Sequence, residues 1–221
     1  MGKTIQLALP YLKGLAYYGT LGFFTYLMVL ITAQYIPLRL DVAFLRIKEA
    51  EIARPYYQVA FFSHVYTSVF VLFFGIFQFS SWIRTQFPKF HRRSGMIYVV
   101  LILVFASPSG LIMGIHANGG LIAQVSFILQ ALLWFIFTYQ ALRFAKTNDW
   151  SKHEAFMLRS YALTLSAISL RLFKWIIVHT LEPPPMDTYR IVSWLGWTVN
   201  LALVEWYIYH RRSVSKRNTL P

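Results

Sequence analysis

Six apolar segments, each long enough to cross a bilayer as a helix, divide almost the whole chain of 221 residues. A spanning helix needs about 20 mostly apolar residues, because the hydrocarbon core is about 30 Å thick. Apolar residues make up 57% of the chain and charged residues 13%, too few charges for the surface of a soluble domain. The sequence therefore predicts an all-α fold, a polytopic membrane protein in which residues 1–212 form a single six-transmembrane-helix bundle. The expected spans are 15–36, 57–82, 95–115, 121–144, 153–178 and 191–209.

Basic residues are concentrated at one end of the predicted bundle. They occupy the turns 84–93 and 143–152 and both chain termini, whereas the opposite loops carry fewer of them. Loops rich in Lys and Arg face the cytoplasm, so both termini are expected there, in a bacterial inner membrane. The net charge of +13 is spread over short loops, which favours contact with the lipid bilayer and its anionic lipids over nucleic-acid binding.

Three segments outside the spans have their own expectations. The basic N-terminus lacks a small-residue cleavage site, so it is predicted to remain attached to the first helix rather than to be removed as a signal peptide. In residues 37–56, Val42, Leu45 and Ile52 recur at roughly helical spacing. This pattern is consistent with a short amphipathic helix on the membrane or with an ordinary loop. The polar residues 213–221 are predicted to form a disordered cytoplasmic tail.

Ionisable side chains within the predicted spans are few, and such groups are usually paired or functional because a charge in hydrocarbon is costly. Arg159 and Glu205 lie at similar predicted depths, so a buried structural ion pair between the fifth and sixth spans is expected. Lys174 is expected to extend towards the outer interface. Arg171 lies deeper, on a polar stripe that begins at His153, and is predicted to meet a buried partner or a ligand.

Histidines near both ends of the predicted bundle are candidate ligands of haem b. A helix bundle binds this cofactor through two histidines from different helices at matching depth. His91 and His153 form the candidate inner pair, and His64 and His116 form the candidate outer pair. Two such haem irons would make an electron path across the membrane. Basic neighbours of the inner pair, among them Arg159, are suited to neutralising haem propionates.

Two alternatives compete with haem for these histidines. His91, His153 and Glu154 suit a small metal site, and histidines at span ends also occur as caps or interfacial side chains. The chain has no cysteine, which excludes disulfides, zinc-thiolate sites, iron–sulfur clusters and a thiol nucleophile. No phosphate-binding, dinucleotide-binding, zinc-protease or nucleophile-elbow motif occurs. No nucleophile–base pair is visible either, so the sequence leaves enzymatic activity open.

The third predicted span is interrupted near its middle by Ser107-Pro108-Ser109-Gly110. Proline removes a backbone hydrogen bond from a helix, so a kink is expected there. Gly110 and Gly114 are small residues one turn apart. This spacing favours close packing against another helix over a slot for a flat ligand.

Three strings in the middle of the chain carry a family resemblance. They are H-R-R-S-G-M-I-Y at 91–98, S-P-S-G-L at 107–111 and H-E-A-F-M-L-R-S-Y-A-L-T at 153–164. In this order they resemble a family of bacterial and fungal predicted membrane proteins catalogued as domain of unknown function 2306. The likeness covers roughly the second to fifth spans. It departs from the family pattern at 154–156, where a basic and then an aromatic residue are expected.

The family resemblance implies a helical membrane fold and carries no activity over. A looser likeness to di-haem transmembrane b-type cytochromes rests only on a helix bundle with histidines near both faces. The leading functional hypothesis is a b-type haem protein that moves electrons across or within the membrane, with a redox partner or quinone. The rival is a haem-free small transporter or a structural subunit of a membrane complex. In that rival, Arg171 and the helix kink line a cavity, and Arg159–Glu205 braces two helices.

Overall fold

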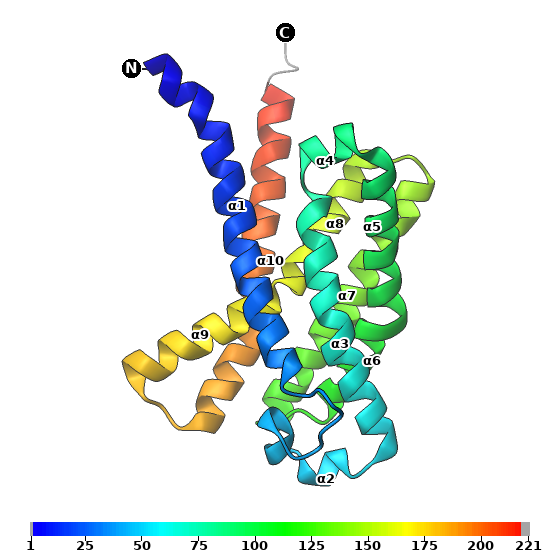
Figure 1. Cartoon of the computed structure of the whole chain (residues 1–221), viewed down its shortest axis with the longest axis vertical. Helices are drawn as coiled ribbons and strands as arrows, with labels where there is room; N and C mark the ends of the chain where they lie inside the picture. Colours follow the sequence, from blue (N-terminus) through cyan, green and yellow to red (C-terminus); the bar gives the residue numbers. More distant parts are fainter. Residues whose placement is uncertain (1, 218–221) are drawn as a thin grey trace.

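The computed structural model describes residues 2–217, with side chains described at residue 12 and at residues 14–213. This part of the chain consists of helices and their connections, without a strand, which confirms the all-α fold. Five helices are long and apolar enough to cross a membrane, and a sixth candidate is a helix pair bent by 41°. The first helix begins, and the last ends, at the same end of the molecule (Figure 1).

The helices follow the predicted spans, with shifts at their ends. The four that form spans alone are α1 (Gly2–Ala33), α3 (Pro55–Gln78), α7 (Leu121–Lys146) and α10 (Pro185–Arg217). Two spans are composite: one contains α5 (Pro88–Val100), a π-helical segment (Leu101–Ala106) and α6 (Ser107–Ile115), and the other contains α8 (Trp150–Thr164) and α9 (Ser166–Leu181). The short elements are a 3-10 helix (Ala43–Ile47), α2 (Glu49–Ile52) and α4 (Ser81–Gln86).

Two predicted boundaries differ from the structure. The second span was expected to reach Trp82, but α3 ends at Gln78 and the Ser80 side chain caps a separate helix, α4, by accepting a bond from the Ile83 N–H. The disordered tail was expected to begin at residue 213, but α10 continues to Arg217. Nucleation is the costly step of helix formation, so a helix already formed in a long span can extend by a turn into the residues that follow. Residues 218–221 of the expected tail lie outside the described residues.

The irregularity expected around Pro108 takes the form of a widened helical turn. Residues 101–106, just before the proline, are π-helical, and the whole stretch Pro88–Ile115 still forms one span. Pro108 has no backbone N–H to donate, so the preceding carbonyls must find other partners. A π-helical segment in the middle of a helix often marks a functional site. Here it places α6 beside the cavity described below.

The fifth predicted span is broken at Leu165, where α8 ends and α9 begins. Neither proline nor glycine is present at the break. Instead, the Thr164 hydroxyl donates to the Ser160 carbonyl at 3.1 Å, and the Ser166 hydroxyl donates to the Leu163 carbonyl at 2.6 Å. Such local bonds compete with helical geometry. The expectation of one continuous stripe from His153 to Arg171 is therefore wrong, because five regular turns do not connect these residues.

The bend at Leu165 turns α9 away from the rest of the bundle. In Figure 1, α9 and the first turns of α10 form a hairpin that stands apart from α3, α5, α6 and α7. The two helices of this hairpin pack against each other, and Gly196 of α10 lies directly against Leu170 of α9. Side chains of the hairpin and of the main bundle line a common cavity, which is described below.

The segment between α1 and α3 folds onto the protein rather than lying flat on the bilayer. Leu45 and Ile52 are buried in a cluster with Tyr35, Tyr57 and Phe61, which belong to the ends of the adjacent spans. Helical turns do form here, as one of the two sequence alternatives expected. Their apolar side faces the bundle instead of lipid, because aromatic residues of α3 offer a protein surface to cover.

The main core is formed by α3, α5, α7 and α8 around a buried tyrosine, Tyr98. The Tyr98 hydroxyl lies 3.0 Å from Ser160 Oγ and 2.9 Å from Thr164 Oγ1. Thr138 Oγ1 lies 2.7 Å from the same serine oxygen, and the Trp134 indole donates to Thr164 Oγ1 at 3.1 Å. These groups satisfy one another away from water, so the network ties α5, α7 and α8 into one rigid unit.

Candidate ligand cavity

A cavity of about 450 Å³ lies in the half of the bundle that is remote from the first residues of α1 and the last residues of α10. Its walls come mainly from α1, α3, α6, α7, α9 and α10, with the last residues of α8, and the 3-10 helix Ala43–Ile47 with Lys48 covers part of it. The volume falls within the range of about 300–1,000 Å³ that is typical of small-molecule sites. The cavity is thus large enough to hold a ligand rather than only ordered water.

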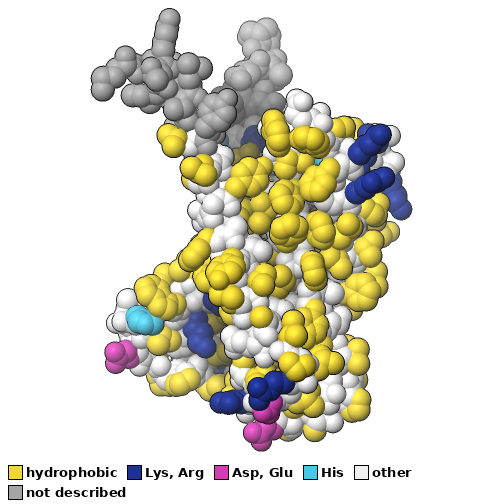
Figure 2. Space-filling model, viewed as in Figure 1, with side chains coloured by type: hydrophobic (Ala, Val, Ile, Leu, Met, Phe, Trp, Pro, Cys, Tyr) yellow, Lys and Arg dark blue, Asp and Glu magenta, His cyan; other side chains and the backbone are white. Residues whose placement is uncertain are grey.

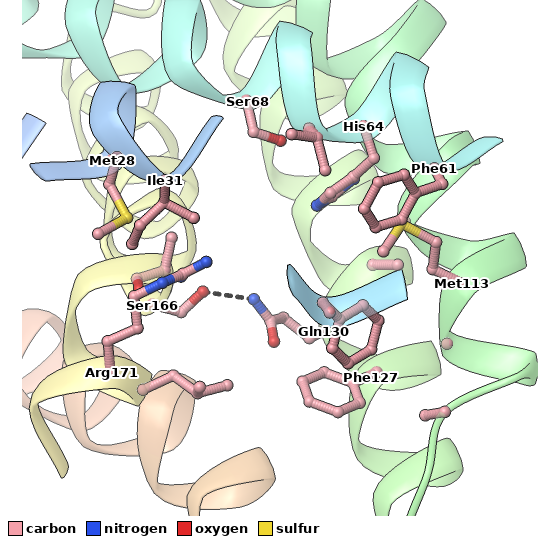
Figure 3. A pocket seen from close by; sticks show the side chains of 18 of the residues that line it. Met28, Ile31, Phe61, His64, Ser68, Met113, Phe127, Gln130, Ser166 and Arg171 are labelled. Atoms are coloured by element: carbon pink, nitrogen blue, oxygen red, sulfur yellow. Dashed lines mark hydrogen bonds between the residues drawn. The ribbon is translucent and has the colours of Figure 1, made fainter. Parts of the chain in front are cut away.

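Most of the cavity wall is apolar, and a few polar side chains reach into it. The apolar part includes Met28, Ile31, Phe61, Met113 and Phe127. Figure 3 shows polar side chains from three separate elements, α3, α7 and α9, pointing into the same space. An apolar enclosure with a small number of convergent polar groups is the usual form of a binding site for a lipophilic ligand. The polar side chains are His64, Ser68, Gln130, Ser166 and Arg171.

His64 is held in place by a close approach to α6. Its Nδ1 lies 2.8 Å from the Ala106 carbonyl oxygen, so Nδ1 carries the proton. A Cβ added at Gly110 would lie 3.0–3.1 Å from the His64 ring, which explains why a residue without a side chain is needed there. The other ring nitrogen, Nε2, is then an acceptor in the neutral imidazole, available to a ligand hydrogen.

Gln130 and Ser166 join α7 to the first turn of α9. Gln130 Nε2 donates to Ser166 Oγ at 2.5 Å, which leaves the amide oxygen of Gln130 able to accept (Figure 3). Gly114 supports the same wall, because a Cβ there would lie 3.2 Å from the backbone of α7. The two glycines of α6 therefore have different tasks: Gly110 makes room for His64, and Gly114 lets two helices approach closely.

Arg171 places a guanidinium group at the cavity wall (Figure 3). Its Nη1 donates to the carbonyl of Ala167, one turn earlier in the same helix, at 2.7 Å. The chain contains eight Asp and Glu residues, all within the described part, and none lies within ion-pair distance of Arg171. The guanidinium has five N–H donors, so most of them are left for a ligand.

Lys174 lies one turn after Arg171 and also borders the cavity. Both cations border a second hollow of about 280 Å³, formed with Trp175, Val178 and His179 on α9. Among the described acidic side chains, none pairs with Lys174. In Figure 2, Lys or Arg side chains lie in the hollow beside the hairpin, surrounded by hydrophobic surface. The two positive charges thus separate the inner cavity from a groove on the outside of α9.

Lys48 is a third cation at the cavity, and it is buried with partners. Its side chain is 1% exposed, its Nζ lies 3.4 Å from a Glu51 carboxylate oxygen, and it donates to the carbonyl of His116. Burial lowers the pKa of Lys48 below its usual value, and the nearby Glu51 carboxylate partly opposes that shift. These bonds tie the covering segment to the end of α6.

Away from the cavity, charged side chains of α8 and α10 neutralise one another. Arg159 donates through Nε and Nη2 to the two Glu205 carboxylate oxygens, at 2.5 and 2.8 Å. Arg211 pairs with Glu154 through a single contact, from Nη1 to one carboxylate oxygen. The Glu205 side chain is 47% exposed, so the Arg159–Glu205 pair lies at the helix surface rather than fully inside as expected. Together, the two pairs clamp α8 to α10.

The structure separates the two histidines of the expected outer haem pair. His64 borders the cavity, whereas His116 Nε2 lies 3.0 Å from the Tyr56 hydroxyl and its ring packs against Tyr56 and Tyr57. His116 is not part of the cavity wall. A haem between these two rings therefore does not fit the cavity.

The expected inner histidines come closer to meeting the needs of haem ligands. His153 Nδ1 lies 2.9 Å from the Ala141 carbonyl, and His91 Nδ1 is buried without a hydrogen-bond partner. Glu154 pairs with Arg211, and the described residues contain no cluster of three or more side chains suited to a metal ion. The alternative metal site with His91, His153 and Glu154 is therefore wrong.

In one of the two sequence hypotheses, Arg171 and the kinked third span line a cavity, and the structure has Arg171 and Gly110 in the cavity wall. His64 was expected as an iron ligand and Gly110 as a helix-packing residue, whereas Gln130 and Ser166 were not singled out. Gln130 is one of three glutamines in the fourth predicted span, with Gln124 and Gln140, so the sequence does not distinguish it from the other two. Its meaning depends on helix packing, which the sequence alone does not provide.

The fold and the cavity define a class: a multi-pass helical membrane protein with a half-enclosed, mainly apolar site between its helices. A family model matches residues 61–208, under the description "Predicted membrane protein (DUF2306)". The chain belongs to this family, which confirms the resemblance seen in the sequence. No curated protein and no solved structure gives a significant match to the chain.

Proposed function

We propose that this membrane protein binds a small lipophilic molecule, taken from the bilayer, in the cavity between α1, α3, α6, α7, α9 and α10. The observation that carries the proposal is a cavity of about 450 Å³ whose wall is mostly apolar and into which His64, Gln130 and Arg171 project. This function agrees with the haem-free small transporter expected as the rival hypothesis. It places the recognition chemistry at Arg171.

The direction of the cavity follows from the distribution of charge. The loops rich in Lys and Arg lie at the end where α1 begins and α10 ends, and such loops favour the cytoplasmic side. We propose that both termini face the cytoplasm of a bacterial inner membrane. The cavity would then lie in the outer half of the bilayer, and the ligand would enter from the outer leaflet.

Cavity filling tests the proposed function directly. Ala167→Phe places a ring in the cavity, and Ala202→Phe is a matched control on an exposed position of α10 outside it. The protein in lipid nanodiscs is labelled with an alkyl diazirine probe, and the labelled residues are mapped by mass spectrometry. We expect saturable labelling of Met28 and Met113 that Ala167→Phe removes and Ala202→Phe leaves. Labelling without saturation in the unmodified protein would contradict the proposal.

A second candidate function is electron transfer through one haem b between His91 and His153. The observation in its favour is that His91 Nδ1 is buried without a partner, while the Ala141 carbonyl orients His153 so that its Nε2 remains free. Ligating histidines usually donate their other ring N–H to such an acceptor. When bound, the haem would supply one-electron chemistry, and these residues would hold the iron.

A reduced-minus-oxidised visible spectrum of protein expressed with ample haem tests the haem candidate. A sharp α-band that His91→Ala removes and His210→Ala retains would support it. A colourless protein would exclude haem and leave the cavity proposal standing, because that proposal needs no cofactor.

A further inference from the structure

We infer that the ligand is a single-chain amphiphile with an anionic head, held by Arg171 and Lys174 while its apolar tail occupies the cavity. This inference rests on the proposed function and specifies its ligand class. The head would lie where the cavity meets the groove on α9, because these two cations border both spaces. The tail would contact the apolar wall that includes Ile31 and Met113.

The cations within the predicted spans differ in whether the protein supplies a counter-charge. Arg159, the other cation within a predicted span, is neutralised by Glu205, and Arg211 near the same helix end is neutralised by Glu154. Arg171 and Lys174 have no such partner among the eight acidic residues, all of which are described. Both side chains are exposed in the protein itself. An isolated charge at the depth of a membrane span is costly, so a counter-charge from outside the protein is favoured.

The Arg171 side chain is directed towards the cavity. A cation that only sought water would extend towards the outer end of α9. The guanidinium instead bonds to Ala167, one turn back towards the break at Leu165, and borders the cavity. This direction turns its remaining donors towards a ligand rather than towards the membrane surface. Guanidinium groups bind carboxylates and phosphates in this way, through two parallel N–H donors.

The size and shape of the cavity limit the ligand that it can hold. The cavity volume of about 450 Å³ lies near the lower end of the range for small-molecule sites. This favours one acyl or alkyl chain over the two chains of an ordinary phospholipid. The opening beside Trp175 and Val178 lies on a helix with many exposed apolar side chains, so a chain can pass between lipid and cavity without crossing water.

A matched set of probes tests the headgroup. The full chain in nanodiscs is saturated with a diazirine alkyl probe, which is displaced by oleate, oleyl phosphate, oleyl alcohol or oleylamine. We expect oleate or oleyl phosphate to displace it about tenfold to a hundredfold better than the alcohol, the range for a charge-assisted bond, and the amine to compete worst. The two anions distinguish a carboxylate from a phosphate head.

Four variants link this preference to the two cations. In Arg171→Gln/Lys174→Gln, the ratio of anion to alcohol affinity should fall to near one, while Arg171→Lys should keep most of it. Arg92→Gln, at the opposite end of the molecule, and Lys152→Gln, beside Asp149, control for adsorption to basic loops and should leave the ratio unchanged. Monodisperse elution of each variant shows that it is folded.

The outcomes separate the inference from the function on which it rests. If the alcohol competes as well as the anions, or if the double variant keeps the preference, the anionic head is excluded while the lipophilic site remains. If the diazirine probe gives no saturable labelling, the proposed function itself fails. A preference for anions that only the double variant abolishes supports both.

Discussion

The cations of α8 and those of α9 follow one another along the chain but have opposite surroundings. In α8, Arg159 is paired with Glu205 of α10. In α9, Arg171 and Lys174 face a cavity, and no described acid is within ion-pair distance of them. The first arrangement fixes two helices relative to each other. The second leaves charge to be neutralised from outside, which distinguishes a structural half from a binding half of the same predicted span.

The largest expected effect is on the structural half. Glu205→Gln removes the charge opposite Arg159 and leaves a guanidinium that is mostly buried, so we expect a loss of about 2–4 kcal/mol of stability. The measurement is the thermal unfolding temperature and folded yield in detergent. Glu182→Gln, at the exposed C-cap of α9, is the control and should behave as wild type. Normal folding of Glu205→Gln would show that this half does not depend on the pair.

The next largest effects are expected from glycine substitutions, one in the rigid core against α8 and one at the cavity. A Cβ at Gly75 would lie 2.2 Å from the Tyr161 ring, so Gly75→Ala should cost about 1–3 kcal/mol through overpacking of the rigid core. Gly110→Ala displaces His64 and should mainly weaken labelling of the cavity. Gly22→Ala, with nothing within 4 Å, is the control and should be neutral or slightly stabilising. Equal loss of stability at Gly75 and Gly110 would remove the distinction between the rigid core and the cavity.

Removing a cation from the binding half should have the opposite sign to breaking the ion pair. Arg171→Gln relieves an unpaired charge, so the ligand-free protein should be unchanged or more stable by up to about 1 kcal/mol. Thermal unfolding after extensive delipidation measures this. A loss comparable to that of Glu205→Gln would mean that Arg171 has a structural partner within the protein.

The smallest effect concerns Lys48, a cation that is buried but partnered. Its folded-state pKa is lowered by burial, so between that value and its usual 10.5 the unfolded chain binds more protons than the folded one. The Lys48 contribution to stability should therefore rise as the pH increases through this alkaline window. Unfolding temperatures from pH 8 to 10 should show a slope that is reduced in Lys48→Met. A slope unchanged in this variant would assign it to other groups.

The sequence was sufficient to predict the spans and the placement of Arg159 opposite Glu205, because hydropathy and helical rise give depth. It was not sufficient for the bend at Leu165. Helices usually break at proline or glycine, and here the hydroxyls of Thr164 and Ser166 bond to the backbone instead. Their side-chain directions depend on neighbouring helices. The cavity could be expected only as one alternative, lined by Arg171 and the kinked third span, because its full wall depends on how α9 departs from the bundle.

The covering segment and α1 border the cavity but lie outside the part of the chain that the family model matches. The family match begins at residue 61, so it includes most of α3 and α5 to α10 but neither α1 nor residues 37–54. Yet Met28, Ile31 and Phe44 form part of the cavity wall. The N-terminal part of the cavity wall thus lies outside the segment that the family model matches. A ligand bound as proposed would contact both the family-matched helices and this N-terminal part.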